Sequence, residues 1–108
     1  MPDRIPPQNI DAEESVLGAL LIDKDAIIKI GASLSPVHFY KDANGEIYAA
    51  ILSLFERREP ADLITVPDEL RKRKKLEEIG GVTYLSSLVS KVPTSANIEY
   101  YANIVKDN

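Results

Sequence analysis

The stretch over residues 44–58 restricts the possible folds more than any other part of this sequence. Its apolar residues recur at intervals of one, three and four, the spacing that places side chains on one face of an α-helix. These residues are Ile47, Ala50, Ile51, Leu54 and Phe55. Pro60 follows closely, and a proline blocks the continuation of a helix. We therefore expect one long helix over residues 44–58, with this apolar face directed into a core.

Shorter stretches with helical spacing lie on both sides of this helix. The first is expected over residues 11–22, because Asp11 and Glu14 have the spacing of a capping box. A short second helix follows, a fifth covers residues 82–92, and a last one ends the chain. The apolar residues of these four stripes are Val16, Leu17, Leu20 and Leu21; Ile27, Ile28, Ile30 and Leu34; Leu85, Leu88, Val89 and Val92; and Ile98, Tyr101, Ala102 and Val105.

Small polar residues and prolines separate these stretches. Ser35 precedes Pro36, an order that predicts a capped single turn in which Phe39 and Tyr40 point inward. The caps expected for the other helices are Asp23 for the second, Thr65 with Asp68 for a fourth over residues 65–75, and Thr94 or Ser95 for the last.

Two adjacent glycines stand between the fourth and fifth helices, in a chain that has only five. Gly80 can adopt the left-handed conformation that ends a helical turn without a steric penalty, and Gly81 lets the next helix start tightly. No two segments have the pattern of paired strands. We therefore expect an all-α fold, a compact bundle of about six short helices.

The composition limits the classes of function. A chain of 108 residues with 44% hydrophobic content fits one small globular domain. Its formal net charge of −4 makes the surface, on average, repel phosphate backbones. The chain has no cysteine, which excludes disulfides and thiolate chemistry and is compatible with a reducing cytosol. Residues 1–15 do not have the pattern of a secretory signal, and the longest apolar run, residues 19–22, is too short for a membrane span, so we expect a soluble protein.

The motifs of common catalytic and cofactor sites are missing from the sequence. No glycines are spaced as in the phosphate-binding loop of an ATPase. The single histidine, His38, lies beside Phe39 without the flanking residues of a nucleophilic triad, and we interpret it as a turn or surface residue. One histidine without cysteines cannot build a metal cluster. We therefore expect no catalytic residue, no metal and no cofactor in this chain.

Two kinds of charged cluster have competing interpretations. Neighbouring carboxylates occur at Glu13 and Glu14 and at residues 77–78, but sequence neighbours point to different sides of a helix, so capping and solubility explain them better than acid–base catalysis. A basic run could contact phosphate or form a solvated face at a helix C-terminus, and we favour the second reading because no aromatic residue is interleaved with it. This run consists of Arg71, Lys72, Arg73, Lys74 and Lys75.

Three tyrosines are candidates for contact with a protein partner. Tyr84, Tyr100 and Tyr101 each combine a large ring with a polar hydroxyl. Core packing with the hydroxyl at the rim explains each of them equally well. Because Tyr101 belongs to the apolar stripe of its helix and Tyr100 does not, we expect Tyr100 to be the more exposed of the two.

Several segments in order resemble one known family. They are IPPQNIDAEESVLG at 5–18, HFY at 38–40, DLITV at 62–66, LEEIGGVTYLSSL at 76–88 and VPTSANIEYYANIV at 92–105. Together they resemble the N-terminal domain of the bacterial replicative DNA helicase of the DnaB type, over essentially the whole chain. One departure is Asn44, where many relatives carry a histidine; asparagine is a good helix cap, and the third helix is expected to start there.

The resemblance implies that the complete protein is a ring-shaped hexameric, ATP-dependent 5′–3′ DNA helicase. Residues 1–108 would form a single N-terminal collar domain. In the family a helical hairpin, a linker and a RecA-like domain that uses ATP and Mg²⁺ follow, and all three are absent from this chain. The resemblance therefore implies that this fragment is not itself an enzyme.

The resemblance also implies the partners of the domain. Collar domains associate as dimers, three to a hexamer, and help to recruit primase and a helicase loader at the replication fork in the bacterial cytoplasm. Direct binding to nucleic acid is not expected to be strong. In the family the Gly-Gly-x-x-Tyr-Leu segment lies near a surface implicated in primase coupling, which makes Tyr84 the nominated interaction residue beside Tyr100.

A rival interpretation comes from charge alone. A small all-helical enzyme could use the basic run, from Arg71 to Lys75, to orient an anionic metabolite. A nucleic-acid clamp would use the same run and would bind DNA with a steep dependence on salt.

Overall fold

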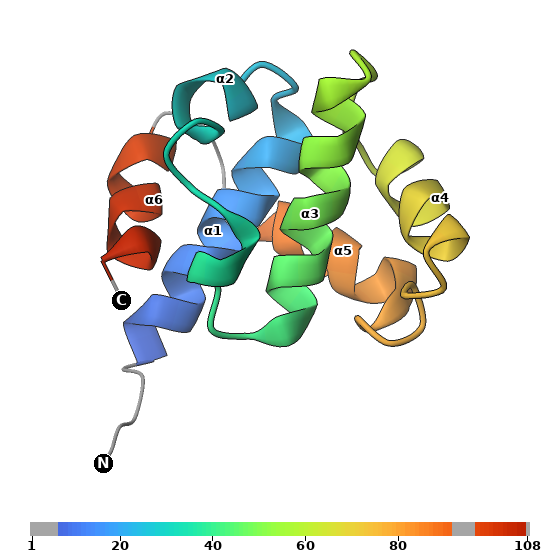
Figure 1. Ribbon diagram of the computed structural model, residues 1–108. Coiled ribbons are helices and arrows are strands. Elements are labelled where there is room, and N and C mark those ends of the chain that lie inside the picture. The colour runs from blue at the N-terminus through green and yellow to red at the C-terminus, as the bar shows by residue number, and fades with distance from the viewer. Residues whose placement is uncertain (1–6, 92–96, 108) are drawn as a thin grey trace.

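The computed structural model describes residues 7–91 and 97–107, with only the backbone described at residues 7–9 (Figure 1). Within these residues the chain forms six α-helices and one 3₁₀ turn and contains no strand, so the all-α prediction is confirmed. The elements are α1 (Pro7–Ile22), α2 (Ile27–Ile30), η1 (Pro36–His38), α3 (Asp42–Glu56), α4 (Thr65–Lys72), α5 (Gly81–Ser90) and α6 (Ile98–Lys106).

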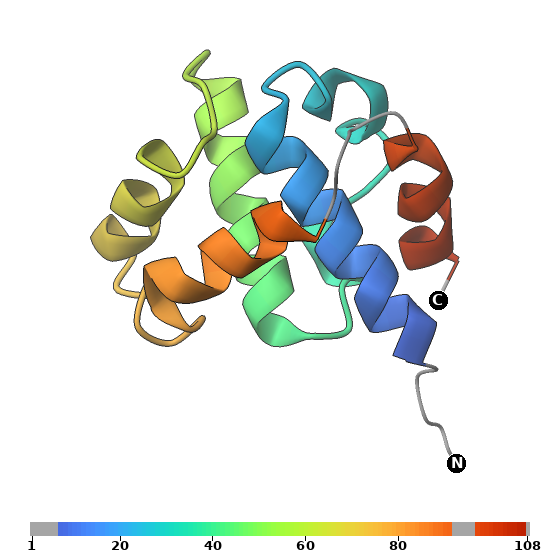
Figure 2. The ribbon, with the colours of Figure 1, turned by 180° about the vertical axis from the view of Figure 1, so that it is seen from behind.

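Helix α1 lies at the centre of the bundle. It packs against α3 on one side and α5 on the opposite side, and α6 lies along its flank (Figures 1 and 2). Helix α4 contacts α3 at the far edge from α6, and α2 contacts α6. This central position explains why α1 is buried on more than one face, including Gly18 and Ala19.

The predicted apolar stripe of α1 is confirmed. Val16 and Leu17 are fully buried, and Leu20 and Leu21 are buried beside them. The helix starts at Pro7, however, and the prediction of a capping box at Asp11 is wrong. A proline fits the first turn of a helix because the missing N–H has no partner there.

Helix α3 confirms four of the five predicted core residues. Ile47, Ala50, Ile51 and Leu54 are buried. Phe55 is 42% exposed, so its assignment to the core is wrong; it lies one residue from the end of the helix, at the margin of the bundle. Tyr48 was missed. It is fully buried, and its hydroxyl is satisfied there because it donates to the Leu34 carbonyl at 2.8 Å. Burial raises the pKa of this phenol to about 12.

The turn before α3 is capped as the sequence predicts. The hydroxyl of Ser35 accepts a hydrogen bond from the Val37 N–H at 3.3 Å. Phe39 is buried, with its ring centroid 5.0 Å from that of Tyr48. Tyr40 is 63% exposed, so only one of the two aromatic residues points inward as expected.

The ends of two other helices differ from the prediction. Asp62, not Thr65, provides the cap of α4, because its carboxylate accepts from the N–H groups of Ile64 and Thr65, both at 2.8 Å. Helix α4 ends at Lys72, and Lys74 has a left-handed φ of 62° that prevents its extension to residue 75. Helix α2 has no side-chain cap, although the Asp23 carboxylate accepts from a nearby N–H at 3.0 Å.

The remaining stripes are largely confirmed. Ile27, Ile30, Leu34, Leu85, Leu88, Ile98, Ala102 and Val105 are buried. Val89 and Tyr101 are partly buried against the core, whereas Ile28 is 66% exposed and does not belong to it. The predicted caps at Thr94 and Ser95, and Val92 of the fifth stripe, lie outside the described residues.

A carboxylate clamped by two guanidinium groups joins α4 to α3. Glu69 accepts from Arg57 Nη2 at 2.8 Å and from Arg73 Nε at 3.0 Å. Arg73 also donates to the Ser53 hydroxyl on α3. The hydrogen bond from Arg57, followed by that from Arg73, lowers the pKa of Glu69.

The core assignment of α3 gives a first prediction. Ile51→Ala should lower the free energy of unfolding by about 2–5 kcal/mol, because it opens a cavity at a buried position. The matched control is Ile28→Ala, the same change at an exposed position, which should alter it by no more than about 0.5 kcal/mol. Urea unfolding followed by circular dichroism measures both values. Equal losses in the two variants would show that the inward face of α3 is misassigned.

The clamp on Glu69 gives a prediction about pH. Because the folded-state pKa of Glu69 is lowered, its contribution to stability is present above the ordinary pKa of 4.5 and is lost as the pH falls through the folded value. Glu69→Gln should therefore be less stable than the parent at neutral pH, and the difference should shrink below pH 4.5. Urea unfolding across a pH series tests this. A difference that stays constant with pH, or that is matched by the exposed control Glu56→Gln, would contradict it.

Candidate functional site

A buried carboxylate lies where α1 meets the start of α3. Glu13 is only 2% exposed. One of its oxygens accepts from the Tyr40 N–H at 2.6 Å, and the other accepts from the side-chain amide of Asn44 at 2.8 Å and from the Lys41 N–H at 3.4 Å. A buried carboxylate is tolerated only when hydrogen-bond donors surround it. Glu13 therefore attaches the loop before α3, and α3 itself, to α1.

Tyr84 extends this network to α5. Its hydroxyl donates to the Asn44 side-chain oxygen at 2.6 Å and lies 3.4 Å from a carboxylate oxygen of Glu14. Lys41 Nζ lies 3.2 Å from the same hydroxyl and 4.4 Å from the centre of the Tyr84 ring. Lys91, just after α5, forms an ion pair of 2.6 Å with Glu14. We call these six residues, Glu13, Glu14, Lys41, Asn44, Tyr84 and Lys91, the Tyr84 network.

The electrostatics of the Tyr84 network favour positioning over proton transfer. Burial, followed by the negative charge of Glu14, raises the pKa of the Tyr84 phenol far above its ordinary value. The hydrogen bond to Glu14 raises the pKa of the Lys91 ammonium. The phenol therefore stays protonated near neutral pH and acts as a hydrogen-bond donor, which suits it to hold three helices together.

The structure corrects the interpretation of Glu13 and Glu14. They were expected to serve capping and solubility, but both are buried and hydrogen bonded. The helix begins earlier than predicted, so both residues lie within it and not at its end. A signal was available: Glu13 lies three and four residues before Val16 and Leu17, which places it on the same buried face. Asn44 is likewise a member of the network, and the residue at the N-cap of α3 is Lys41.

The two adjacent glycines support the position of Tyr84. Gly80 has a φ of 110°, as predicted for the residue that ends the preceding turn. A Cβ at Gly80 would lie 2.9 Å from the Cβ of Tyr84, so a larger residue could not be accommodated without a shift. Gly81 also has a positive φ, of 72°, but has open space around it. Gly80 is therefore required both for its backbone conformation and for the close approach of Tyr84.

Most cations of the basic run form ion pairs, and Arg73 is directed toward α3 instead of lying on a solvated face. Its ion pairs within the described residues are Arg71 and Lys72 with Asp68, Arg73 with Glu69, and Lys75 with Glu46 and Glu78. Arg71 and Lys72 lie in the last turn of α4, where the helix dipole favours cations. These carboxylates reduce the positive field that an anionic metabolite or DNA would need, so the geometry does not favour the two rival interpretations.

His38 and Tyr100 lie in different parts of the fold, outside the Tyr84 network. His38 accepts a hydrogen bond from the Ser35 N–H at 2.9 Å and completes the cap of η1, which confirms its interpretation as a turn residue. Tyr100 is 67% exposed on α6, and its ring meets that of the partly buried Tyr101 edge to face, with centroids 5.5 Å apart. The prediction that Tyr100 is the more exposed of the pair is confirmed. The structure does not bring Tyr100 to the Tyr84 network, because the two lie on different helices and share no contact among those described.

Among the described residues, no three histidine, aspartate or glutamate side chains are grouped so that they could hold a metal ion. No helix in the described part of the chain combines the length and apolar character of a membrane span.

The fold and the Tyr84 network define a class of protein. It is a small all-helical domain in which a cluster of hydrogen-bonded polar side chains joins α1, α3 and α5. The sequence matches the family described as "DnaB-like helicase N terminal domain" over residues 5–107, and the chain belongs to that family.

Curated relatives and a solved structure agree with this assignment. The chain is 50% identical over 105 residues to the replicative DNA helicase DnaB of Geobacillus stearothermophilus, and 49% identical over 105 residues to the replicative DNA helicase DnaC of Bacillus subtilis. These alignments cover 97% of this chain and 23% of each relative, so the chain spans about a quarter of their length. The crystal structure of the N-terminal domain of DnaB helicase from Mycobacterium tuberculosis matches with a TM-score of 0.90 and 50% identity, over 95% of this chain and 72% of that one.

The buried carboxylate gives a third prediction. Glu13→Gln should lower the free energy of unfolding by about 1–3 kcal/mol, because an amide group turns an NH₂ toward donors that need an acceptor. Amide hydrogen exchange at Tyr40 should become faster. The exposed control Glu77→Gln should change neither quantity. Unchanged stability and exchange in Glu13→Gln would show that the carboxylate does not hold the loop before α3.

Proposed function

We propose that this chain is the N-terminal protein-interaction and assembly domain of an ATP-dependent 5′–3′ replicative DNA helicase. The observation that carries the proposal is the match of nearly the whole chain to this one domain of relatives named as replicative helicases. The sequence has no phosphate-binding loop. ATP and Mg²⁺ are therefore assigned to another domain of the complete protein, and residues 1–108 to a single collar domain without its own enzymatic activity.

The proposed partners are proteins. The collar would form dimers, three to a hexameric ring, and would help to couple primase and a helicase loader to that ring at the replication fork in the cytoplasm. The net charge of −4 supports protein contact over a direct grip on DNA. In the complete protein, the helical hairpin that the family places after this region would add to the dimer and to the primase contact.

Tyr84 is proposed to act in primase coupling by positioning. Its hydroxyl is engaged inside the network, whereas Lys41 and Lys91 hold the exposed edge of the same cluster. Loss of the hydroxyl would remove the hydrogen bond that joins α5 to Asn44 of α3 and would leave the Asn44 oxygen without this donor. A partner that contacts this edge would then meet a less fixed surface. Tyr100 is the second proposed contact, because an exposed tyrosine offers a large area at a low entropic cost.

Titration with the C-terminal domain of the cognate primase tests this function. The parent chain and a version extended by the hairpin are compared by calorimetry, and the extended version should bind more tightly. Tyr84→Phe should weaken binding of the extended version by about tenfold, a loss of about 1.4 kcal/mol. Tyr40→Phe, the same change at an exposed tyrosine outside the network, is the matched control.

The outcomes of this titration are separable. No binding of primase by either length would contradict the assembly function. Binding that Tyr84→Phe leaves unchanged would contradict the role of Tyr84 alone. A thermal melt of each variant separates loss of contact from loss of fold, because Tyr84→Phe keeps the ring that packs against the core.

A further inference from the structure

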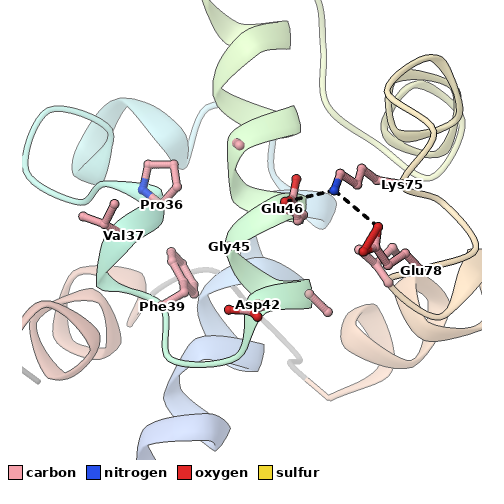
Figure 3. Close-up of a pocket in the computed structure, with 11 residues that line it drawn as sticks. Pro36, Val37, Phe39, Asp42, Gly45, Glu46, Lys75 and Glu78 are labelled. Carbon is pink, nitrogen blue, oxygen red and sulfur yellow. Dashed lines mark ion pairs between the residues drawn. The ribbon is translucent and has the colours of Figure 1, made fainter.

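A groove of about 780 Å³ lies between η1, the first half of α3 and the turn before α5 (Figure 3). It shares no residue with the Tyr84 network. Lys75 is the only residue of the basic run that lines the groove, and Tyr100 does not line it. Its lining is divided by chemistry: one part is apolar, and the other carries charged side chains.

The apolar part of the groove lies where the short turn η1 meets Gly45 of α3. Gly45 contributes no side chain, and a Cβ at this position would lie 3.2 Å from the Pro36 carbonyl, so the glycine lets η1 approach α3 closely. Phe39 and Ile79 are buried beneath the groove. Val37 is 86% exposed at its edge. An isolated exposed valine is ordinary, but one beside an apolar hollow provides an unfilled contact surface.

The charged part is mainly acidic. Asp42, Glu46 and Glu78 line the groove, and Lys75 is the only cation among its lining residues, all of which belong to the described chain. Lys75 Nζ lies 3.3 Å from Glu78 and 3.8 Å from Glu46, as the dashed lines in Figure 3 show. The single ammonium is thus already shared by two carboxylates, and the rim keeps an excess of negative charge.

We propose that this groove binds a segment of a partner protein in which leucine or isoleucine lies beside lysine or arginine. The apolar side chain packs beside η1, over Pro36, Phe39 and Gly45, and the cation meets the carboxylates of Glu46 and Glu78 on the other side of the groove. The rim disfavours DNA and anionic metabolites, because three carboxylates would face their phosphates or carboxylates. Charge complementarity therefore selects a basic and apolar peptide.

Three defined peptides test the inference. The probe is acetyl-Ala-Lys-Leu-Ala-Lys-Leu-amide; one control replaces both lysines with glutamate, and the other replaces both leucines with alanine. Each is titrated into the ¹⁵N-labelled 108-residue chain and followed by NMR. The probe should shift the amides of Val37, Gly45 and Glu78, and each control should bind at least about threefold more weakly.

Matched variants locate the binding. Glu46→Gln combined with Glu78→Gln should weaken the probe by about threefold to fivefold, as expected for partly exposed ion pairs. The control, Glu56→Gln combined with Glu99→Gln, removes the same charge elsewhere and should leave affinity unchanged. Val37→Ser should weaken binding, whereas Ile28→Ser should not.

Several results would overturn the inference. They are equal binding of the lysine and glutamate peptides, shifts that cluster away from the groove, no saturable shift, and equal effects of the two glutamine double variants. Shifts of the groove amides with protein concentration alone would assign the groove to a second copy of the chain instead. None of these outcomes tests primase binding through Tyr84. The groove and the Tyr84 network share no residue, so the NMR signals of different backbone amides report on each.

Discussion

The buried carboxylate of Glu13 holds three parts of the chain in fixed positions. It accepts hydrogen bonds from two backbone N–H groups before α3 and from the side chain of Asn44 within α3, while it is itself part of α1. Asn44 is oriented by this contact, and its oxygen then accepts from Tyr84 on α5. One nearly fully buried acceptor therefore adds directional contacts to the apolar packing of α1, α3 and α5.

Two surfaces depend on this placement. On one side the network reaches the surface at Lys41 and Lys91, around the ring of Tyr84. On the other, the segment attached to Glu13 continues back into η1, which forms one wall of the groove above Gly45. Both surfaces therefore include a short, irregular piece of chain, the loop before α3 or the turn η1, whose position is linked to the carboxylate of Glu13 in the interior. Loops placed by a rigid scaffold commonly carry binding functions.

The sequence predicts the helices and most of the core, because apolar spacing depends on local geometry alone. Leu17, Ile51 and Leu88 are buried as that spacing requires. Ile28 and Phe55 have the same spacing but are exposed, because burial also needs a neighbouring element, and the pattern does not say where neighbours end. The family resemblance indicates the function class, yet no local pattern indicates the groove, which forms only when η1 meets α3.

The candidate site was predicted only in part for a related reason. The sequence singles out Tyr84 and the glycine pair, but it assigns Glu14 to capping and solubility and Asn44 to a helix cap, whereas both contact the Tyr84 hydroxyl. Residues far apart in sequence, such as Glu14 and Lys91, meet only through the tertiary fold, and a single sequence carries no record of such pairs. The cap by Asp62 was overlooked because Thr65 and Asp68 offered the same motif three residues later.

A buried charge is an expensive way to join helices, and this indicates what the Tyr84 network contributes. Apolar residues of similar volume in place of a buried ionic group often stabilise a protein as well or better. They would not, however, fix which backbone N–H groups face the interior, since apolar contacts have no direction. The carboxylate favours one orientation of the loop at Tyr40 and Lys41 and, through Asn44, one position of the Tyr84 hydroxyl. For a domain that we propose to present surfaces to other proteins, that single orientation matters more than added stability, because partners bind with least loss of entropy to a surface already in place.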